Sequence, residues 1–262
     1  MAKASRGGQR AGGRLSGSGN IQSNQNTQPS SQSDAQIDNT QQASAFSTDY
    51  NTFMAMTDDQ KADVISTAVQ QGVPAHLAQN SFQKFIYNSG LNDKPDIVSD
   101  ATLDSMNGTE MWRTVNSVYD SKNDISYNAD QIARQVQAGR VTRVSDNGGS
   151  LYGRGIYFAD NRSGSAAYGN SRGNVKKTAV VRCKLNNNAK VINYSQASSG
   201  ANSEMRKGTK LGKVLSKCDH ESRASIYAMA KGYNVISAGN YSGYYNVLNR
   251  NAITMSSTIS AL

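Results

Sequence analysis

The sequence is poor in the residues that build metal centres and disulfide frameworks. It has only two cysteines, Cys183 and Cys218, and two histidines, His76 and His220, and their spacing matches no metal-binding motif. We therefore expect neither a bound metal nor a disulfide. The chain also has no apolar run of eighteen residues and no apolar stretch near its N-terminus. These absences predict a soluble protein that neither spans a membrane nor carries a secretion signal.

Large apolar side chains are almost missing from residues 1–45, which consist mainly of Gly, Ser, Gln and Asn. Such a segment cannot bury enough surface to offset the entropy of ordering, so we predict a disordered arm. The formal net charge is +9, and four basic residues lie in this arm: Lys3, Arg6, Arg10 and Arg14. The arm could make weak contacts with nucleic acid. Elsewhere basic residues are scattered without interleaved aromatics, which favours a solvated basic face over a base-stacking surface.

Residues 46–106 carry helical patterns and are predicted to form a helical layer. In "TDDQKADVISTAVQQGVP", Thr57 can cap a helix with Gln60 three residues later, and Gly72 and Pro74 end it. A second helix is expected in "PAHLAQNSFQKFIYNSG", ending at Gly90, and a short third one in "SDATLDSMNG".

Residues 107–262 are richer in strand patterns. The segments "EMWRTV", "GIYFA", "TAVVRCKL", "KVINY", "YNVIS" and "YYNVLN" are rich in Val, Ile and Tyr and are bounded by Gly and Asn. Helices are expected in "NADQIARQVQAG" and "DHESRASIYAMAKG", each with an N-cap residue and a closing glycine. Because strands dominate after residue 140, we predict a mixed α+β domain rather than alternating βαβ units.

The most informative segment is "LYGRGIYFADNRSGSAAYG", Leu151 to Gly169. If "GIYFA" is a strand, Tyr157 points to the face opposite Ile156 and Phe158. A helix capped by Ser163 would follow, with Ser165 and Tyr168 on one of its faces. Two tyrosine rings and a hydroxyl would then line a pocket for a flat aromatic ring that bears an amide, and nicotinamide is one candidate. The alternative is that both tyrosines are ordinary core residues.

This segment closely resembles the nicotinamide-pocket motif of the ADP-ribosyltransferase superfamily, in its poly(ADP-ribose) polymerase and diphtheria-toxin-like branch. The resemblance implies a split antiparallel β-sandwich with short helices, and NAD as the substrate, with no metal. It further implies that Tyr157 and Tyr168 enclose the nicotinamide, that Ser165 binds its carboxamide, and that Gly155 contributes to the pocket. Tyr168 is also a catalytic candidate.

The family's first motif lies on an earlier strand, and "EMWRTV" occupies that place. By this resemblance Arg113 would hold the dinucleotide phosphates, for which a bidentate guanidinium is well shaped. Thr114 stands where the family usually has a glycine beside the nicotinamide. The alternative for Arg113 is an exposed arginine at a strand end.

The family's catalytic glutamate corresponds to Tyr244 in "GYYNVLN". A tyrosine hydroxyl is protonated at neutral pH and replaces a carboxylate poorly. No acidic residue follows Glu221. The nearest carboxylates are Glu204, expected in a polar loop, and Asp219 and Glu221, expected to stabilise a helix N-terminus. The missing glutamate argues against synthesis of long polymers.

The stretch that begins at "SFQKFIYNSGLNDKP" also resembles the helical lead-in of ADP-ribosyltransferase domains attached to bacteriophage minor head proteins. This implies a phage-encoded protein located in the virion or the host cytoplasm, with a host protein target or phage head proteins as partners. Two functions follow. One is a mono-ADP-ribosyltransferase that releases nicotinamide, with Arg113, Tyr168 and Tyr244 in the catalytic positions. The other is an inactive virion component that retains the fold.

Overall fold

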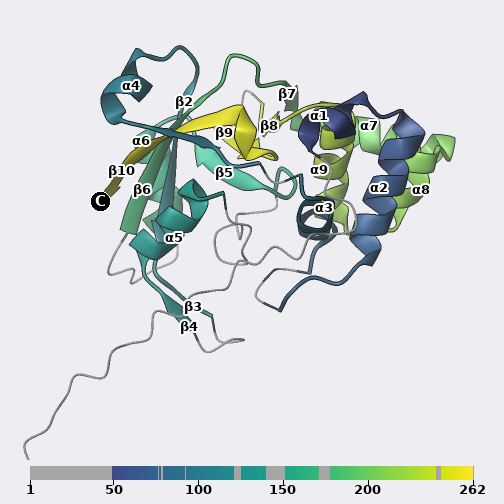
Figure 1. Cartoon of the computed structure of the whole chain (residues 1–262), viewed down its shortest axis with the longest axis horizontal. Helices are drawn as coiled ribbons and strands as arrows, with labels where there is room; N and C mark the ends of the chain where they lie inside the picture. The colour runs from purple at the N-terminus through teal and green to yellow at the C-terminus, as the bar shows by residue number, and fades with distance from the viewer. Residues whose placement is uncertain are drawn as a thin grey trace, which may run out of the picture. The chain divides into compact units, whose positions relative to one another are not determined.

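The computed structural model describes residues 49–75, 77, 79–91, 93–120, 125–139, 151–170, 178–239 and 243–261. All of them belong to one compact unit, Gln41–Leu262. The predicted arm, residues 1–45, lies outside the described residues. Within the described ranges, helices accompany one large mixed sheet (Figure 1), and this confirms the predicted α+β class.

Helices form in the three predicted segments: α2 (Asp58–Gln70), α3 (Ser81–Ser89), which begins later than predicted, and, after the short strand β1 (Asp96–Val98), α4 (Asp100–Ser105). A helix that was not predicted, α1 (Tyr50–Ala55), precedes them, and α4 packs against the last strand, β10 (Ile253–Ala261), apart from the other three (Figure 1). The capping box of α2 forms as predicted, because the Thr57 hydroxyl accepts from Gln60 N–H and the Gln60 side chain accepts from Thr57 N–H. Helix α3 is capped by Asn80 and ends at Gly90, whose φ of 75° suits glycine.

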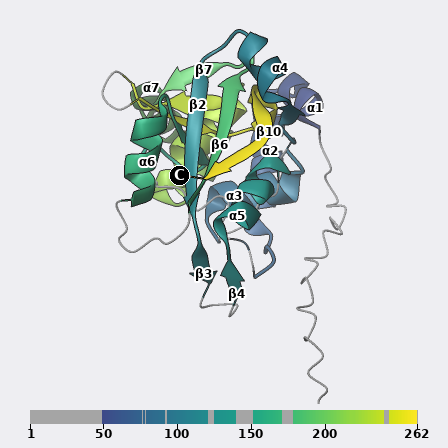
Figure 2. The ribbon, with the colours of Figure 1, turned by 90° about the vertical axis from the view of Figure 1, so that its left-hand side faces the viewer.

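All six predicted strand segments lie in the sheet. The strands after β1 are β2 (Glu110–Asn116), β5 (Ile156–Ala159), β6 (Thr178–Leu185), β7 (Val191–Asn193), β8 (Val235–Ser237), β9 (Tyr244–Val247) and β10 (Ile253–Ala261). Their order is β1-β10-β6-β2-β5-β9-β8-β7. The edge pairs β1–β10 and β7–β8 are parallel, so the sheet is mixed and not purely antiparallel, as the family resemblance had implied. Strands β3 (Val118–Asp120) and β4 (Ile125–Tyr127) form a separate pair, which Figure 2 shows at the lower end of β2.

The sheet is nearly divided in the middle. Strand β2 pairs with β6 along its whole length, from Glu110 to Asn116. With β5, however, β2 forms a single pair, Trp112 with Ala159. The sheet therefore consists of two four-stranded halves, and β2 and β5 diverge on either side of one contact.

The described residues form two hydrophobic cores, and the second includes side chains from both halves of the sheet. One contains α1, α2 and α3 together with α7 (Tyr194–Lys207), α8 (Lys210–Ser216) and α9 (His220–Ala230), which gather at one side of the sheet in Figure 1. The other lies between the sheet and α5 (Ala129–Gln137). The short helix α6 (Arg162–Asn170) contacts β2 and β5, and η1 (Arg250–Ala252) precedes β10. The N-terminal helices thus share their core with the helices that follow β7.

One carboxylate joins the two groups of helices. Asp219 Oδ1 accepts from Ser222 N–H at 3.1 Å and caps α9, while Oδ2 accepts from Ser81 N–H at 2.7 Å in the first turn of α3. Burial raises the pKa of the Asp219 carboxyl, but hydrogen bonds from Ser81 and Ser222 outweigh this and hold the pKa below its usual value. The ionised form is therefore the one that the fold stabilises.

Replacing this shared cap should destabilise the protein in a pH-dependent way. We expect Asp219→Ala to lower the free energy of unfolding by about 2 kcal/mol at pH 7, because two helix N-termini lose an acceptor. Since the folded-state pKa is depressed, the advantage of wild type is fully present above the unfolded-state pKa. It should shrink as the pH falls below about 3.8. Chemical denaturation at several pH values measures this, with the exposed Asp59→Ala as control, and an equal loss in both variants would contradict it.

Candidate functional site

Polar side chains lie where β2 and β5 no longer pair. Trp112–Ala159 is the one register pair between β2 and β5, so Tyr157 of β5 is not paired with a residue of β2. Arg113 fills this place, and its Nη1 donates to Tyr157 O at 3.0 Å. Arg113 is therefore half-buried at the break between the two halves of the sheet, and it is not the exposed strand-end arginine that the sequence left as an alternative.

Two hydroxyl groups meet across the same break. Thr114 Oγ1 lies 2.9 Å from Ser165 Oγ, at hydrogen-bond distance, although the two residues are 51 positions apart. Ser165 is only 4% exposed. It lies on α6, which packs along β2. The side chain at position 114, where the resemblance expects a glycine, is thus a partner of the predicted carboxamide-binding serine.

Tyr157 occupies the face that its alternation predicts. Ile156 and Phe158 are 4% and 1% exposed and belong to the core beneath the sheet, whereas Tyr157 is only half-buried. Its hydroxyl donates to Gly153 O at 2.7 Å and accepts from Tyr152 N–H at 2.8 Å. The ring is therefore fixed to the loop that precedes its own strand.

Sequence reasoning missed Asn246, which holds this loop from the neighbouring strand. Asn246 is the register partner of Tyr157 and is 1% exposed. Its Nδ2 donates to Tyr152 O at 2.9 Å and to Arg154 O at 3.3 Å. Gly155, with φ of 155°, lies directly against Asn246, so a side chain there would collide with Asn246 Oδ1. The only local signal was a polar residue inside the apolar pattern "YYNVLN".

The remaining predicted site residues surround the start of α6. Tyr244 pairs with Ala159 at the beginning of β9, and its hydroxyl donates to Gly164 O at 3.5 Å. Helix α6 begins at Arg162, before the predicted cap Ser163, because Asn161 Oδ1 accepts from Gly164 N–H. Tyr168 lies in α6, but its side chain is outside the described part of the chain, so its place against the ligand stays a prediction.

The three carboxylates nearest to the end of the chain have structural partners. Asp219 caps α9, as predicted, and Glu221 lies in the first turn of α9, 3.6 Å from Arg154 Nη2. Glu204 lies in α7 and not in the predicted polar loop. It accepts from the Thr209 hydroxyl at 2.6 Å and lies 3.4 Å from Lys231 Nζ.

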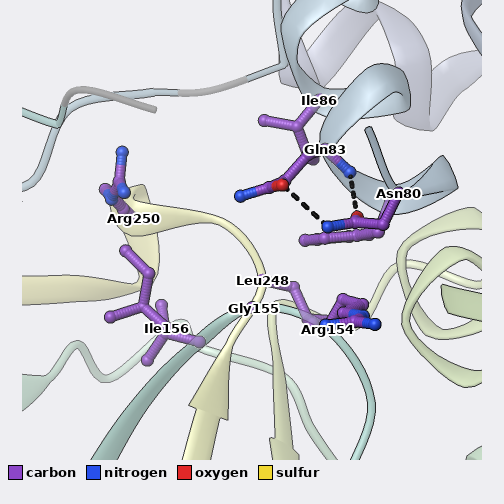
Figure 3. A pocket seen from close by; sticks show the side chains of 10 residues that line it. Asn80, Gln83, Ile86, Arg154, Gly155, Ile156, Leu248 and Arg250 are labelled. Atoms are coloured by element: carbon purple, nitrogen blue, oxygen red, sulfur yellow. Dashed lines mark hydrogen bonds between the residues drawn. The ribbon is translucent and has the colours of Figure 1, made fainter. Parts of the chain in front are cut away.

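A small cavity lies beside Gly155, between α3 and the segments that carry Ile156 and Leu248 (Figure 3). The amides of Asn80 and Gln83, hydrogen-bonded to each other, form part of its wall. Its volume of about 20 Å³ accommodates roughly one water molecule. A dinucleotide does not fit there, so the break between β2 and β5 is the stronger candidate site.

Other chemistries find little support among the described residues. They contain no group of three or more His, Cys, Asp or Glu that could hold a metal ion, and none of their helices is long and apolar enough to cross a membrane. Both cysteines are free and buried. Burial raises the pKa of the Cys218 thiol to about 11 and that of Cys183 well above its usual value, so neither is an activated nucleophile.

The Gly155 turn supports a direct test of the packing behind Tyr157. We expect Gly155→Ala to lower the free energy of unfolding by about 2 kcal/mol or more, because the added Cβ meets Asn246 and the Val247 carbonyl in a backbone conformation that suits glycine. Gly72→Ala, where a Cβ meets nothing within 4 Å, should change stability by less than about 0.5 kcal/mol. Equal stability of the two variants in urea would contradict this packing.

Comparisons with protein-family models, with curated proteins and with solved structures found no match.

Proposed function

We propose that the protein is an NAD⁺-dependent mono-ADP-ribosyltransferase, which transfers ADP-ribose to a protein side chain and releases nicotinamide. The observation that carries this proposal is the polar set in the break of the sheet. Arg113 of β2 binds the backbone carbonyl of Tyr157, and Thr114 of the same strand pairs with Ser165 of α6. These two contacts link β2, which carries the candidate phosphate-binding arginine, to the strand and the helix of the motif that resembles a nicotinamide pocket, and they support the proposal.

Each of these groups has a role in binding the substrate. A serine hydroxyl is both donor and acceptor, so Ser165 can pair with a carboxamide, and Thr114 orients it through their mutual hydrogen bond. The tyrosine ring offers a flat apolar face to the nicotinamide. Arg113 presents a planar guanidinium with five N–H donors, which suits the diphosphate. Binding to Tyr157 O uses one of these donors and orients the group.

In the proposed reaction, the protein mainly has to stabilise charge and need not form a covalent bond to the substrate. The bond between the ribose C1′ and the nicotinamide nitrogen breaks, its electron pair leaves with nicotinamide, and positive charge develops on the ribose. Groups fixed before the reaction stabilise this charge most effectively. The Tyr157 ring is fixed to residues 152–153 by two hydrogen bonds, so one wall of the proposed pocket is organised in advance.

The second candidate is an inactive virion component with the same fold. Tyr244 favours it, because a tyrosine bonded to Gly164 O stands where the resembling family has its catalytic glutamate. This reading predicts a stable fold with no turnover of NAD⁺. The experiment below therefore separates the two functions.

The test measures NAD⁺ binding and nicotinamide release on the full chain. We expect NAD⁺ at ten times its dissociation constant to raise the melting temperature by about 4 °C. We also expect chromatography to detect nicotinamide formation in the presence of host lysate. Ser165→Ala should reduce nicotinamide release about tenfold, because one hydrogen bond to the carboxamide is lost. Labelled NAD⁺ identifies the protein that receives ADP-ribose.

The matched control is Ser163→Ala, which removes an exposed hydroxyl from the same helix. It should leave both measurements unchanged. A melting temperature that rises with NAD⁺ but without any nicotinamide release would favour the inactive component. If NAD⁺ neither stabilises the protein nor is cleaved, the transferase proposal fails, and so does any role of this site in binding NAD⁺.

A further inference from the structure

The proposed reaction benefits from a carboxylate near the ribose, and the strand position that should provide it carries Tyr244. The three carboxylates nearest to the C-terminus are engaged elsewhere: Glu204 with Thr209 and Lys231, Asp219 at the start of α9, and Glu221 with Arg154. A fourth carboxylate, Asp160, directly follows the neighbouring strand β5 and lies against Gly243, the residue before Tyr244.

Asp160 follows the last residue of β5. Its N–H donates to Gly243 O at 2.7 Å, next to the pair formed by Ala159 and Tyr244. Its carboxyl group covers the Cα of Gly243, because an ideal Cβ on Gly243 would come within 2.6 Å of Asp160 Cγ. Gly243 also has φ of 56°, which disfavours any other residue. The space at the residue before Tyr244 is thus occupied by the Asp160 carboxylate.

The first turn of α6 holds Asp160 and Tyr244 together. Asn161 Nδ2 donates to Asp160 Oδ1 at 2.6 Å, and Asn161 Oδ1 accepts from Gly164 N–H at 2.6 Å. The carbonyl of the same Gly164 accepts from Tyr244. The carboxylate is therefore oriented by a helix that also carries Ser165.

Asp160 is also accessible, and the described part of the chain offers it no cationic partner. Its side chain is exposed, and among the described residues no Lys, Arg or His forms an ion pair with it. This distinguishes it from Asp219 and Glu221, which lie close to Arg154. A carboxylate that is oriented, exposed and uncompensated is suited to a positively charged partner that arrives with the substrate.

We propose that Asp160 is the catalytic carboxylate of this protein and takes the place of the glutamate that is absent at position 244. This inference rests on the function proposed above. Asp160 accepts a hydrogen bond from a hydroxyl of the nicotinamide ribose and stabilises the positive charge that develops on the ribose as the glycosidic bond breaks. Tyr244 remains a neighbour that donates to α6.

The step balances without a further reactant. The C1′–N bond breaks, and its electron pair leaves with neutral nicotinamide. The acceptor, a protein side chain or water, forms the new bond to C1′ and loses one proton to solvent. Asp160 forms no covalent bond in the step and is not consumed.

The experiment compares nicotinamide release by wild type, Asp160→Asn, Tyr244→Glu and the double variant. We expect Asp160→Asn to lower the rate constant about 100-fold, because a charge that acts mainly in the transition state is lost. The rise in melting temperature with NAD⁺ should be unchanged, since the pocket for nicotinamide is intact. The double variant should release nicotinamide at least ten times faster than Asp160→Asn alone, because Tyr244→Glu returns a carboxylate to the adjacent strand.

The control is Asp59→Asn, which removes an equally exposed carboxylate from α2 and should retain the wild-type rate. A rate for Asp160→Asn within threefold of wild type would overturn the assignment and leave the proposed function standing. Loss of NAD⁺ binding in Asp160→Asn, or no recovery in the double variant, would also overturn it. If wild type itself releases no nicotinamide, the proposed function fails, and the role of Asp160 fails with it.

Discussion

The arrangement of the site depends on how little contact β2 makes with β5. A regular antiparallel pair would satisfy its backbone groups along the whole length of both strands. Here one pair, Trp112–Ala159, joins the two halves of the sheet, and the groups beyond it need other partners. The Arg113 side chain supplies a donor for Tyr157 O, and Thr114, whose side chain points to the other face of β2, bonds with Ser165 on α6. The break thus brings polar side chains into a partly buried place that the rest of the sheet could not offer.

The loop before β5 is fixed by its neighbours on several sides. Asn246 and the Tyr157 hydroxyl bind its backbone, and Ser225 Oγ on α9 donates to Arg154 O at 2.7 Å. The Arg154 side chain lies near Asp219, which itself joins α9 to α3. A continuous set of contacts therefore runs from the N-terminal helices to the wall of the proposed pocket. This connection gives the helices before the sheet a part in positioning Tyr157.

Sequence patterns predicted the elements that have strong local signals. The strands rich in Val, Ile and Tyr were found, and so were the helices with clear caps, such as α2 and α9. Helices α1, α7 and α8 were missed. Helix α7 is polar and packs through Ala197 and Ala201, so it shows no apolar stripe, although its Asn193–Gln196 capping box was a usable signal. Strand β10 was missed because "ITMSSTISA" is polar in its second half, where it becomes exposed.

In the candidate site, too, the features set by local sequence were predicted and those set by long-range contacts were not. The alternation of Ile156, Tyr157 and Phe158 is a local property and was predicted correctly. The pairing of Thr114 with Ser165, the approach of Asn246 to Gly155 and the place of Asp160 beside Tyr244 depend on strand register and on helix docking. No spacing in the sequence encodes them. Long-range partners of short polar side chains therefore had to come from the structure.

The central claim is that the break between β2 and β5 binds the nicotinamide half of NAD⁺. A crystal structure of the protein with NAD⁺ tests this most directly. The account predicts the carboxamide at hydrogen-bond distance from Ser165 Oγ, the ring against Tyr157 and the diphosphate on Arg113. Density for the dinucleotide at any other surface, with the Thr114–Ser165 contact undisturbed and Arg113 still closed on Tyr157 O, would contradict it.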